Sequence, residues 1–380
     1  MKTITLYNPY WSTFGGGEKY LLILAEVLSQ VPQVAVTLLS SARDIKKSDL
    51  DQFFHIDLSK ISYVFFQGGL HKVKQLTKGV DVFVCLSNFR RVPSSAHNSV
   101  QLLQIPYGKI TAASLVRKVG RGKLKESVKD LYRLQLLSYS KRKVDLVITN
   151  SHFVSEVLSR NFGIQSHVLH PPIQDFFIEG MAKKKIILSV GRFFIGLYND
   201  KRYDILTEAF RRISRSSLSG WEYHIAGSCA SDPATKGMLD SLQNQNEGFP
   251  ISFHINEPYE SLQRLYNGAT IFWHGAGFGV DEASLPERVE HFGMTTVEAM
   301  STGCIPVVCN KGGQKEIVQH GLNGYLWNTI DELVARTISI AHGNVHSQRD
   351  MQQNTRKRFQ DFNMERFQQT ATELFRPLLT

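Results

Sequence analysis

Short apolar runs alternate with segments of helical periodicity along most of the chain. In the first half, five apolar runs predict buried strands, at residues 4–8, 34–40, 80–86, 100–106 and 144–151. Between them, apolar residues recur with helical spacing, most clearly at 18–29 and 124–137. Strands that are apolar throughout and alternate with helices predict a parallel sheet covered on both faces.

A second series of the same kind begins after His170-Pro171-Pro172, a stop typical of a linker. One helix is predicted at 205–213, and five more strands are predicted at 185–190, 223–226, 251–255, 270–274 and 305–309. The two halves repeat an architecture without repeating a sequence. The chain therefore belongs to the α/β class, with two Rossmann-like domains.

A length of 380 residues exceeds the usual size of one hydrophobic core, which also favours two domains. We expect an N-terminal domain at 1–172 and a C-terminal domain at 173–362. The remaining residues, 363–380, predict an amphipathic helix with four apolar residues near one face, Phe367, Ala371, Leu374 and Phe375.

Four cysteines are scattered without paired spacing, at Cys85, Cys229, Cys304 and Cys309. This pattern predicts neither a disulfide framework nor a structural metal. The N-terminus lacks the apolar segment and cleavage site of a signal peptide, and the sequence has no run of about 18 apolar residues that could span a membrane. We therefore expect a cytoplasmic protein.

Positive charge is concentrated in residues 109–143. This segment has eleven Lys and Arg residues against two acids, Glu126 and Asp130, so it carries +9 of the chain's net +10. Such a segment attracts an anionic membrane surface or another polyanion. A solvated helical face is the alternative.

The run from Glu290 to Met300 carries the strongest chemical signal. Glu290 precedes a turn at Gly293, and Glu298 lies in the helical stretch that follows. If Gly293 opens the helix, its free N–H groups form an anion site flanked by two carboxylates. A nucleotide sugar needs both features, because its diphosphate accepts hydrogen bonds and its hydroxyls donate them. Two glutamates eight apart also occur by chance, and an exposed helical glutamate is usually only solvated.

With the strand that follows it, this run resembles the Glu-x7-Glu signature of the family-4 retaining glycosyltransferases. The resemblance implies a GT-B fold, in which two Rossmann-like domains face a cleft and a terminal helix packs back on the first domain. It implies that Glu290 contacts the donor sugar and that Glu298 accepts from the ribose. It also implies that the backbone around Gly293 binds the donor, through His291, Phe292, Gly293, Met294 and Thr295.

Further motifs match that family at strand ends. Gly191-Arg192 follows one strand and Lys201 precedes the next helix, so Arg192 and Lys201 are expected to stabilise the leaving diphosphate as part of the catalytic set with Glu290. The remaining expected donor-binding residues are Gly15, Gly16 and Gly17 after the first strand, Gly191, Gly227, and His274. Without the resemblance, these cations are surface charges, the glycines a flexible loop and His274 a core histidine. Pro258-Tyr259 falls where the family holds the base by backbone contacts.

Two departures from the family pattern stand out. The usual Lys-Gly reads Lys201-Arg202 here. The histidine that many members carry in the first domain is replaced by the run Gln104-Ile105-Pro106-Tyr107, so we assign Gln104 and Tyr107 to the acceptor region. Gln104 can hydrogen-bond, but it cannot act as a base at neutral pH.

The expected function is transfer of a sugar, with mannose favoured, from a GDP or UDP sugar to a hydroxyl of a glycan or lipid-linked acceptor. The resemblance implies that the configuration is retained. We expect no cofactor, and no metal, because no cluster of carboxylates stands beside the phosphate-binding cations. The partners are the nucleotide sugar, the acceptor and an anionic membrane surface touched by 109–143, and nucleic acid is not expected. The alternatives are a non-catalytic scaffold that binds polyanions or nucleic acid, and a sugar-nucleotide epimerase of the same fold.

Overall fold

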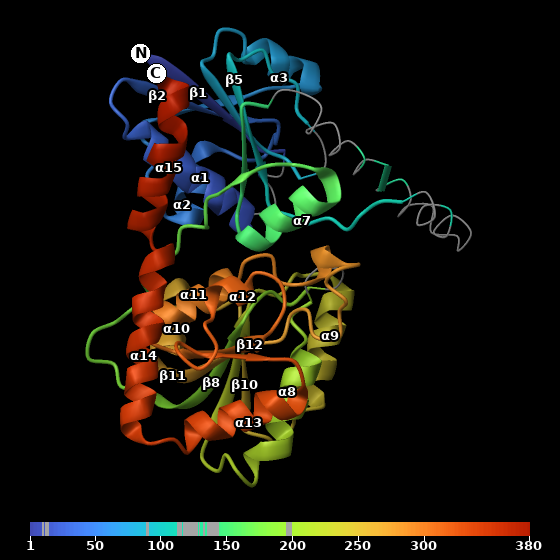
Figure 1. Cartoon of the computed structure of the whole chain (residues 1–380), viewed down its shortest axis with the longest axis vertical. Coiled ribbons are helices and arrows are strands. Elements are labelled where there is room, and N and C mark those ends of the chain that lie inside the picture. Colours follow the sequence, from blue (N-terminus) through green and yellow to red (C-terminus); the bar gives the residue numbers. More distant parts are fainter. Residues whose placement is uncertain are drawn as a thin grey trace. The chain divides into compact units, whose positions relative to one another are not determined.

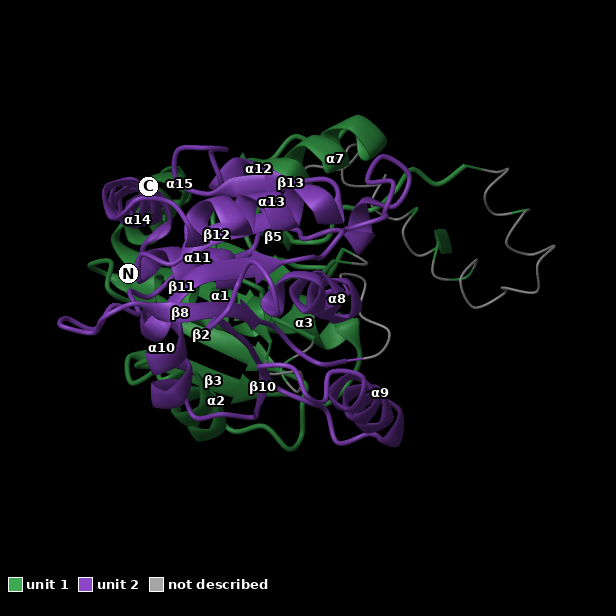
Figure 2. Cartoon of the chain, turned by 90° about the horizontal axis from the view of Figure 1, so that it is seen from below, with its two compact units in different colours: residues 1–172, 364–380 green, residues 173–363 purple. Residues whose placement is uncertain are grey.

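Two parallel sheets organise the chain in the computed structural model, one in each of two units (Figure 1). Unit 1 consists of Met1–Pro172 and Met364–Thr380, and unit 2 consists of Ile173–Asn363 (Figure 2). The structure describes residues 1–9, 11, 15–88, 91–111, 116, 128, 130–131, 134, 144–194 and 200–380.

The sheet of unit 1 has the strand order β3-β2-β1-β4-β5-β6-β7. Its strands are β1 (Lys2–Tyr7), β2 (Val34–Ser40), β3 (Ile61–Phe65), β4 (Val82–Leu86), β5 (Asn98–Leu103), β6 (Leu146–Thr149) and β7 (His167–Val168). The helices described in this unit are α1 (Gly16–Ser29), α2 (Lys47–Phe54), α3 (Leu70–Leu76), α7 (His152–Phe162) and α15 (Met364–Leu379).

Alternating side chains of each strand in unit 1 pack on opposite faces of the sheet. In β4, Val82 and Val84 join the core beneath α1, α2 and α15, whereas Phe83 and Cys85 pack with Val73 of α3. Both faces are therefore apolar, as predicted for a covered parallel sheet. The five strands expected in this half correspond to β1, β2, β4, β5 and β6.

The sequence reading missed β3, and the reason is its position. It is an edge strand of the sheet and exposes Ser62, Val64 and Phe65, so its sequence is not a continuous apolar run. The helix expected at 124–137 lies almost entirely outside the described residues.

The sheet of unit 2 has the order β10-β9-β8-β11-β12-β13. Its strands are β8 (Lys184–Val190), β9 (Glu222–Gly227), β10 (Ile251–Ile255), β11 (Ala269–His274), β12 (Ile305–Cys309) and β13 (Tyr325–Trp327). Its helices are α8 (Tyr203–Ser214), α9 (Pro233–Asn244), α10 (Tyr259–Gly268), α11 (Met294–Ser301), α12 (Gln314–Ile317), α13 (Ile330–Ala341) and α14 (Val345–Phe359).

The faces of this second sheet are also covered on both sides. One core contains Phe210 of α8, Leu239 of α9 and Leu333 of α13, and the other contains Tyr266 of α10 and Val297 of α11. The strand order is that of a dinucleotide-binding sheet, and it reverses direction between β8 and β11. Ligands of such sheets bind at the carboxyl ends of the strands beside that reversal.

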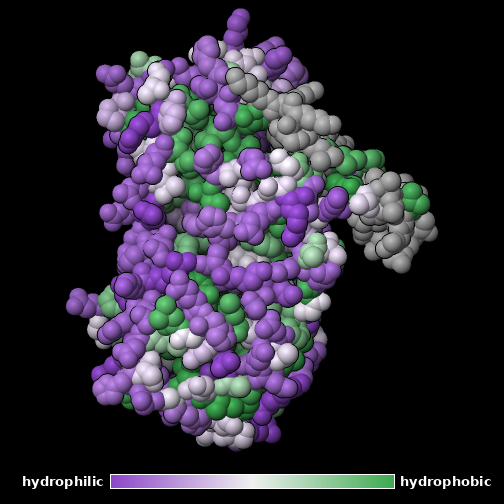
Figure 3. Space-filling view, viewed as in Figure 1, coloured by the Kyte–Doolittle hydropathy of each residue, from purple (hydrophilic) through white to green (hydrophobic). Residues whose placement is uncertain are grey.

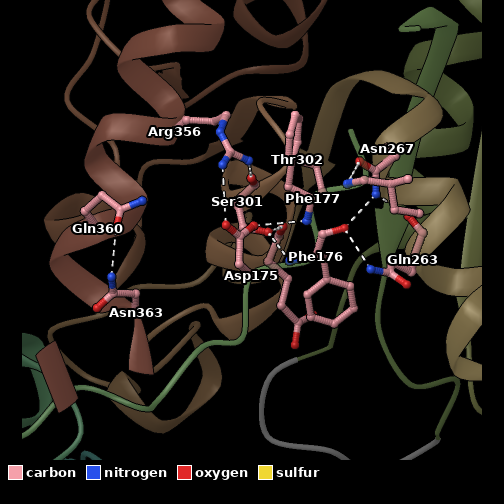
Figure 4. A network of polar contacts seen from close by, with 12 residues as sticks. Asp175, Phe176, Phe177, Gln263, Asn267, Ser301, Thr302, Arg356, Gln360 and Asn363 are labelled. Atoms are coloured by element: carbon pink, nitrogen blue, oxygen red, sulfur yellow. Dashed lines mark hydrogen bonds and ion pairs between the residues drawn. The ribbon is translucent and has the colours of Figure 1, made fainter. Parts of the chain in front are cut away.

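Where the chain enters unit 2, a polar network holds it in place (Figure 4). The N–H of Phe176 donates to Ser301 Oγ at 3.0 Å, and its carbonyl accepts from the side-chain amides of Asn267 and Gln263. Arg356 of α14 pairs with Asp175 at 3.4 Å. These contacts tie the entering segment to α10, α11 and α14.

Hydrophilic residues cover most of the molecular face in Figure 3, with smaller apolar groups between them. This agrees with apolar side chains gathered inside each unit. Among the described residues, none of the helices combines the length and the apolar composition needed to cross a membrane.

Helix α15 packs beside α1 within unit 1. Phe367, Ala371 and Phe375 are buried at intervals of four residues, which places them on one face of the helix. Phe367 meets the ring of Tyr20 edge-on at 5.5 Å, and the Tyr20 hydroxyl donates to Leu169 O at 3.0 Å.

We therefore expect Phe367→Ala to lower the free energy of unfolding of unit 1 by about 3–5 kcal/mol, because it leaves a cavity against α1. Gln369→Ala removes an exposed side chain from the same helix and should change stability by less than about 0.5 kcal/mol. Urea unfolding of both variants checks this expectation. Equal stability of the two would show that α15 does not complete the core.

Candidate active site

The strand order of the sheet in unit 2 locates the candidate site. Strand β8 ends at Val190, before Gly191 and Arg192, and the neighbouring β11 ends at His274. These two strands flank the reversal of strand order, so the predicted residues on both lie at the ligand-binding edge.

A buried ion cluster lies at this edge. Lys201 Nζ is 2.6 Å from Glu290 Oε2, and His274 Nε2 is 3.1 Å from the same oxygen. Lys201 and His274 are themselves 3.5 Å apart. The structure thus brings together three predicted residues from the start of α8, the end of β11 and the loop before α11.

The electrostatics of the cluster keep Glu290 ionised. Burial acts to raise the pKa of Glu290, but Lys201 and His274 outweigh it and hold the pKa below its usual range. Burial lowers the pKa of His274, although its hydrogen bond to Glu290 opposes this. A neutral imidazole donating from Nε2 to the carboxylate fits this environment.

Both partners of Glu290 converge on Oε2, and no described residue donates to Oε1. A carboxylate oxygen accepts more than one hydrogen bond, so Glu290 can be held in place by the cluster and still accept from a ligand hydroxyl. The cluster fixes the carboxylate without using all of its acceptor capacity.

The loop after Glu290 depends on glycine at three positions. Gly293 has φ +121° at the start of α11, where a side chain would also meet the Gln314 amide at 2.8 Å. A Cβ on Gly312 would lie 2.1 Å from Glu290 O, and the N–H of Gly313 donates to that oxygen at 2.8 Å. Gly312 and Gly313 were not predicted from the sequence. A Gly-Gly pair shortly after the buried strand β12 is the feature that could have indicated them.

The start of α11 provides hydrogen-bond donors. Among the described residues, none accepts from the N–H groups of Met294 and Thr295, the first two of the helix. These groups can bind an anion or a hydroxyl oxygen. Nearby, the side chain of His291 is held by Glu287 O at 3.1 Å, and burial lowers its pKa.

Glu298 lies in α11 and is held by a residue that the sequence reading missed. The hydroxyl of Tyr266 in α10 donates to Glu298 Oε2 at 2.8 Å. Tyr266 is fully buried, and burial raises its pKa far above the usual range. A neutral tyrosine that only donates fixes the carboxylate without neutralising it. No local motif marks Tyr266, because its role appears only when α10 packs on α11.

Arg192 is exposed, and among the described residues it forms no hydrogen bond or ion pair with the cluster. Together with Lys201, Tyr203 and Asp204, it lines a cavity of about 310 Å³. The loop between Arg192 and Lys201 includes residues 195–199, which lie outside the described residues.

Gly191 and Gly227 are close to each other at the ends of β8 and β9. A Cβ on Gly227 would lie 1.8 Å from Gly191 O, and one on Gly191 would lie 2.9 Å from the Tyr203 hydroxyl. That hydroxyl donates to Gly191 O at 3.0 Å. Packing alone therefore accounts for glycine at both positions, whether or not they also contact a donor.

Arg202 replaces the glycine that follows the lysine in the resembling family, and it occupies a conformation that suits glycine. Its φ is +54°. The guanidinium donates to Phe278 O at 2.7 Å and forms two bonds of 3.1 Å with Asp204. These contacts offset the backbone strain and fasten the loop after His274 to the start of α8, next to Lys201.

The residues predicted in unit 1 lie at the start of α1 and in the segment after β5. Gly16 and Gly17 begin α1, and the N–H of Gly15 donates to Glu18 Oε2 at 2.8 Å. A Cβ on Gly17 would lie 3.0 Å from Gln104 Oε1, so the glycine loop and Gln104 lie side by side. Tyr107 is fully buried in the core that includes α7. The basic segment 109–143 falls mostly outside the described residues.

Comparison with known proteins agrees with this geometry. The family model described as glycosyl transferases group 1 matches residues 173–358. Mannosylfructose-phosphate synthase of Agrobacterium fabrum is 24% identical over 229 residues, which cover 55% of this chain and 47% of that protein. The GDP-Man:Man(3)GlcNAc(2)-PP-Dol alpha-1,2-mannosyltransferase of Dictyostelium discoideum is 25% identical over 206 residues, which cover 48% and 37%. The chain spans less than half the length of both curated relatives.

Solved structures match the whole chain. A glycosyltransferase from Rickettsia africae superposes with a TM-score of 0.71 at 16% identity, covering 100% of this chain and 99% of that one. Anabaena HepE in complex with UDP and glucose superposes with a TM-score of 0.70 at 15% identity, covering 99% and 100%. These likenesses confirm the predicted GT-B fold class.

The ion cluster generates a test with a defined pH dependence. We expect Lys201→Met to destabilise unit 2 by about 3–5 kcal/mol at pH 7, because it leaves the buried Glu290 charge without its ammonium partner. Burial would then raise the folded-state pKa of Glu290 above its unfolded value, so the loss should shrink as the pH falls toward 4 and Glu290 takes up a proton.

Urea unfolding followed by tryptophan fluorescence measures this effect, since three of the four tryptophans, Trp221, Trp273 and Trp327, lie in unit 2. Adding Glu290→Gln to Lys201→Met should restore most of the stability. An equal loss at both pH values would contradict the assignment.

Proposed function

We propose that this protein, whose residues 173–358 match the family model described as glycosyl transferases group 1, transfers a sugar from a nucleoside diphosphate sugar to an acceptor hydroxyl with retention of configuration. The observation that carries the proposal is the Lys201–Glu290–His274 cluster at the strand reversal, beside the free N–H groups that open α11. A cation, a fixed carboxylate and backbone donors at one edge suit a ligand with both phosphate and hydroxyl groups.

In this proposal, each group has one task. Glu290 accepts from a hydroxyl of the donor sugar through its remaining acceptor capacity. The ammonium of Lys201 has three N–H donors, so it can hold Glu290 and still donate to a phosphate oxygen. Arg192, exposed on the same edge, adds a second cation. Glu298, oriented by Tyr266, accepts from the ribose hydroxyls.

The transfer step needs no protein base. The bond between the anomeric carbon and the leaving phosphate oxygen breaks, and the acceptor oxygen bonds to that carbon on the same face. The acceptor proton passes to the leaving phosphate oxygen. Lys201, Arg192 and the N–H groups of α11 stabilise the charge on that phosphate as it departs. An amide at Gln104, which cannot take up a proton, is compatible with this route.

The names of similar proteins favour two donor substrates. The name of the Dictyostelium relative contains GDP-Man and that of the Agrobacterium relative contains mannosyl, which favours GDP-mannose. HepE was crystallised with UDP and glucose, which keeps UDP-glucose as the second candidate. We propose a glycan or lipid-linked hydroxyl as the acceptor, and a reaction that is independent of metal ions.

Donor binding provides the direct test of this function. Thermal-shift measurements should show one of GDP-mannose, UDP-glucose or ADP-glucose stabilising the protein. Glu298→Ala should weaken binding of the matching nucleoside diphosphate by about 1.5–3 kcal/mol, the scale of hydrogen bonds to a charged group. Glu247→Ala, an exposed glutamate in a turn, is the matched control.

Turnover of the stabilising donor should persist in EDTA, and NMR of the product should show the donor's anomeric configuration. Inactivation by EDTA that Mg²⁺ or Mn²⁺ reverses would contradict the metal-independent route. Inversion at the anomeric carbon would contradict retention.

A membrane-bound acceptor generates a separate prediction. Within 109–143, three apolar side chains that the structure describes, Val116, Val128 and Leu131, are exposed. Exposed apolar groups among clustered cations suit a membrane interface, where each Lys or Arg near an anionic surface contributes about 1 kcal/mol.

We expect the protein to float with anionic vesicles at low salt. A quadruple variant should be released from the vesicles, with glutamate replacing Lys118, Arg121, Lys123 and Lys125. A matched control reverses four exposed lysines elsewhere, Lys60, Lys74, Lys78 and Lys236. If the unchanged protein does not float, the segment is a solvated face and the acceptor is soluble.

A further inference from the structure

The loop of residues 275–289 begins after β11 and leads directly to Glu290. In the middle of this loop, the half-buried side chain of Glu282 reaches a distant part of the chain. Its Oε2 accepts from the N–H of Gly312 at 2.8 Å, and its Oε1 accepts from the ammonium of Lys315 at 2.6 Å. One carboxylate therefore fastens the loop to the turn and short helix that follow β12.

The turn that Glu282 holds is in direct contact with the backbone of Glu290. The N–H of Gly313 donates to Glu290 O at 2.8 Å. A Cβ on Gly312 would lie 2.1 Å from the same oxygen and 2.8 Å from a methyl group of Val289, whose side chain is fully buried. Because the turn packs this closely, a displacement of Gly312 also displaces the backbone that carries the Glu290 carboxylate.

Val289 is enclosed from another side by the first residues of the same loop. A Cβ on Gly277, whose φ is +90°, would lie 3.0 Å from a Val289 methyl group and 2.9 Å from Lys311 Cβ. The start of the loop, its last residue and the turn after β12 therefore pack around one side chain. Glu282 bonds the middle of the loop to that turn, so its two hydrogen bonds hold the packed segments together.

We propose that Glu282 is a positioning residue for Glu290. By holding Gly312, it fixes the turn that sets the backbone of Glu290, and with it the direction in which the carboxylate meets the donor sugar. This inference rests on the proposed function, in which Glu290 accepts from a hydroxyl of that sugar. A misplacement of about 1 Å in such a site costs on the order of 100-fold in rate. A nucleoside diphosphate has no such sugar, so its binding does not depend on Glu282.

Steady-state kinetics of the full-length protein, with the donor that stabilises it, test this role. Glu282→Ala removes both hydrogen bonds and should lower kcat by about 10- to 100-fold. Isothermal titration of the matching nucleoside diphosphate, UDP or GDP, should give an affinity within about twofold of that of the unchanged protein. A general loss of folded protein would instead lower kcat and the stoichiometry of the titration together.

Two further variants separate the two bonds of Glu282. Lys315→Met breaks the ion pair and leaves the bond to Gly312, and because an exposed ion pair contributes little, kcat should stay within about twofold. Glu282→Gln keeps an oxygen that can accept from Gly312, so it should restore kcat to within about fivefold of the unchanged protein. A loss in Lys315→Met as large as that in Glu282→Ala would overturn the proposal, since the charge would then matter and not the bond to Gly312.

A comparison of urea unfolding midpoints needs no donor and separates this inference from the proposed function. If Glu282 positions Glu290, Glu282→Ala weakens the pair with Lys201 as well as the bonds of the loop itself. Its shift of the midpoint should therefore be smaller, by about half, in a protein that already carries Lys201→Met and Glu290→Gln. Equal shifts in the two backgrounds, or an unchanged kcat in Glu282→Ala, would overturn the positioning role. If the unchanged protein turns over no donor, the proposed function fails, and the midpoints alone decide whether Glu282 positions Glu290.

Discussion

The ion pair between Lys201 and Glu290 is the interaction on which the site in unit 2 depends. Each charge would be costly to bury alone, and together they draw His274 into the same cluster. Lys201 lies just before α8, His274 ends β11 and Glu290 precedes α11. The cluster therefore joins three elements that are distant in the sequence. An ionised carboxylate is thereby held at the edge of the sheet, with an oxygen left for a ligand.

The parallel sheet explains why these elements meet at all. Adjacent strands of one direction bring their carboxyl ends to a single edge, and the reversal between β8 and β11 separates the helices that follow them. The close approach of Gly191 to Gly227 and of Gly312 to Glu290 lets the backbone pack at this edge where a Cβ would not fit. The sheet brings these segments to one edge, the glycines let them pack closely there, and the buried ion pair fixes the carboxylate of Glu290.

The sequence predicted the parts of this arrangement that depend on local pattern. Ten of the strands follow apolar runs, whereas Glu290, Lys201 and His274 were expected from the resemblance to the family-4 glycosyltransferases together with their positions next to those runs. It could not predict contacts that arise only from packing. Tyr266 looks like any core tyrosine until α10 meets α11, and β3 was missed because an edge strand need not be apolar on both faces. The pairing of Gly17 with Gln104 likewise joins segments about 90 residues apart, which periodicity does not connect.

Arg202 shows how a departure from a family pattern can be accommodated by the structure. A left-handed conformation at a residue with a side chain is unfavourable, so a substitution for glycine at φ +54° persists only if the side chain returns stability. The guanidinium does this by joining Asp204, the carbonyl of Phe278 and, at 5.6 Å, the face of the Phe278 ring. Because these partners lie on the loop after His274 and on α8, the contacts hold together the two segments that carry His274 and Lys201. The contacts of Arg202 therefore offset its backbone strain and give the two segments of the ion cluster an additional support.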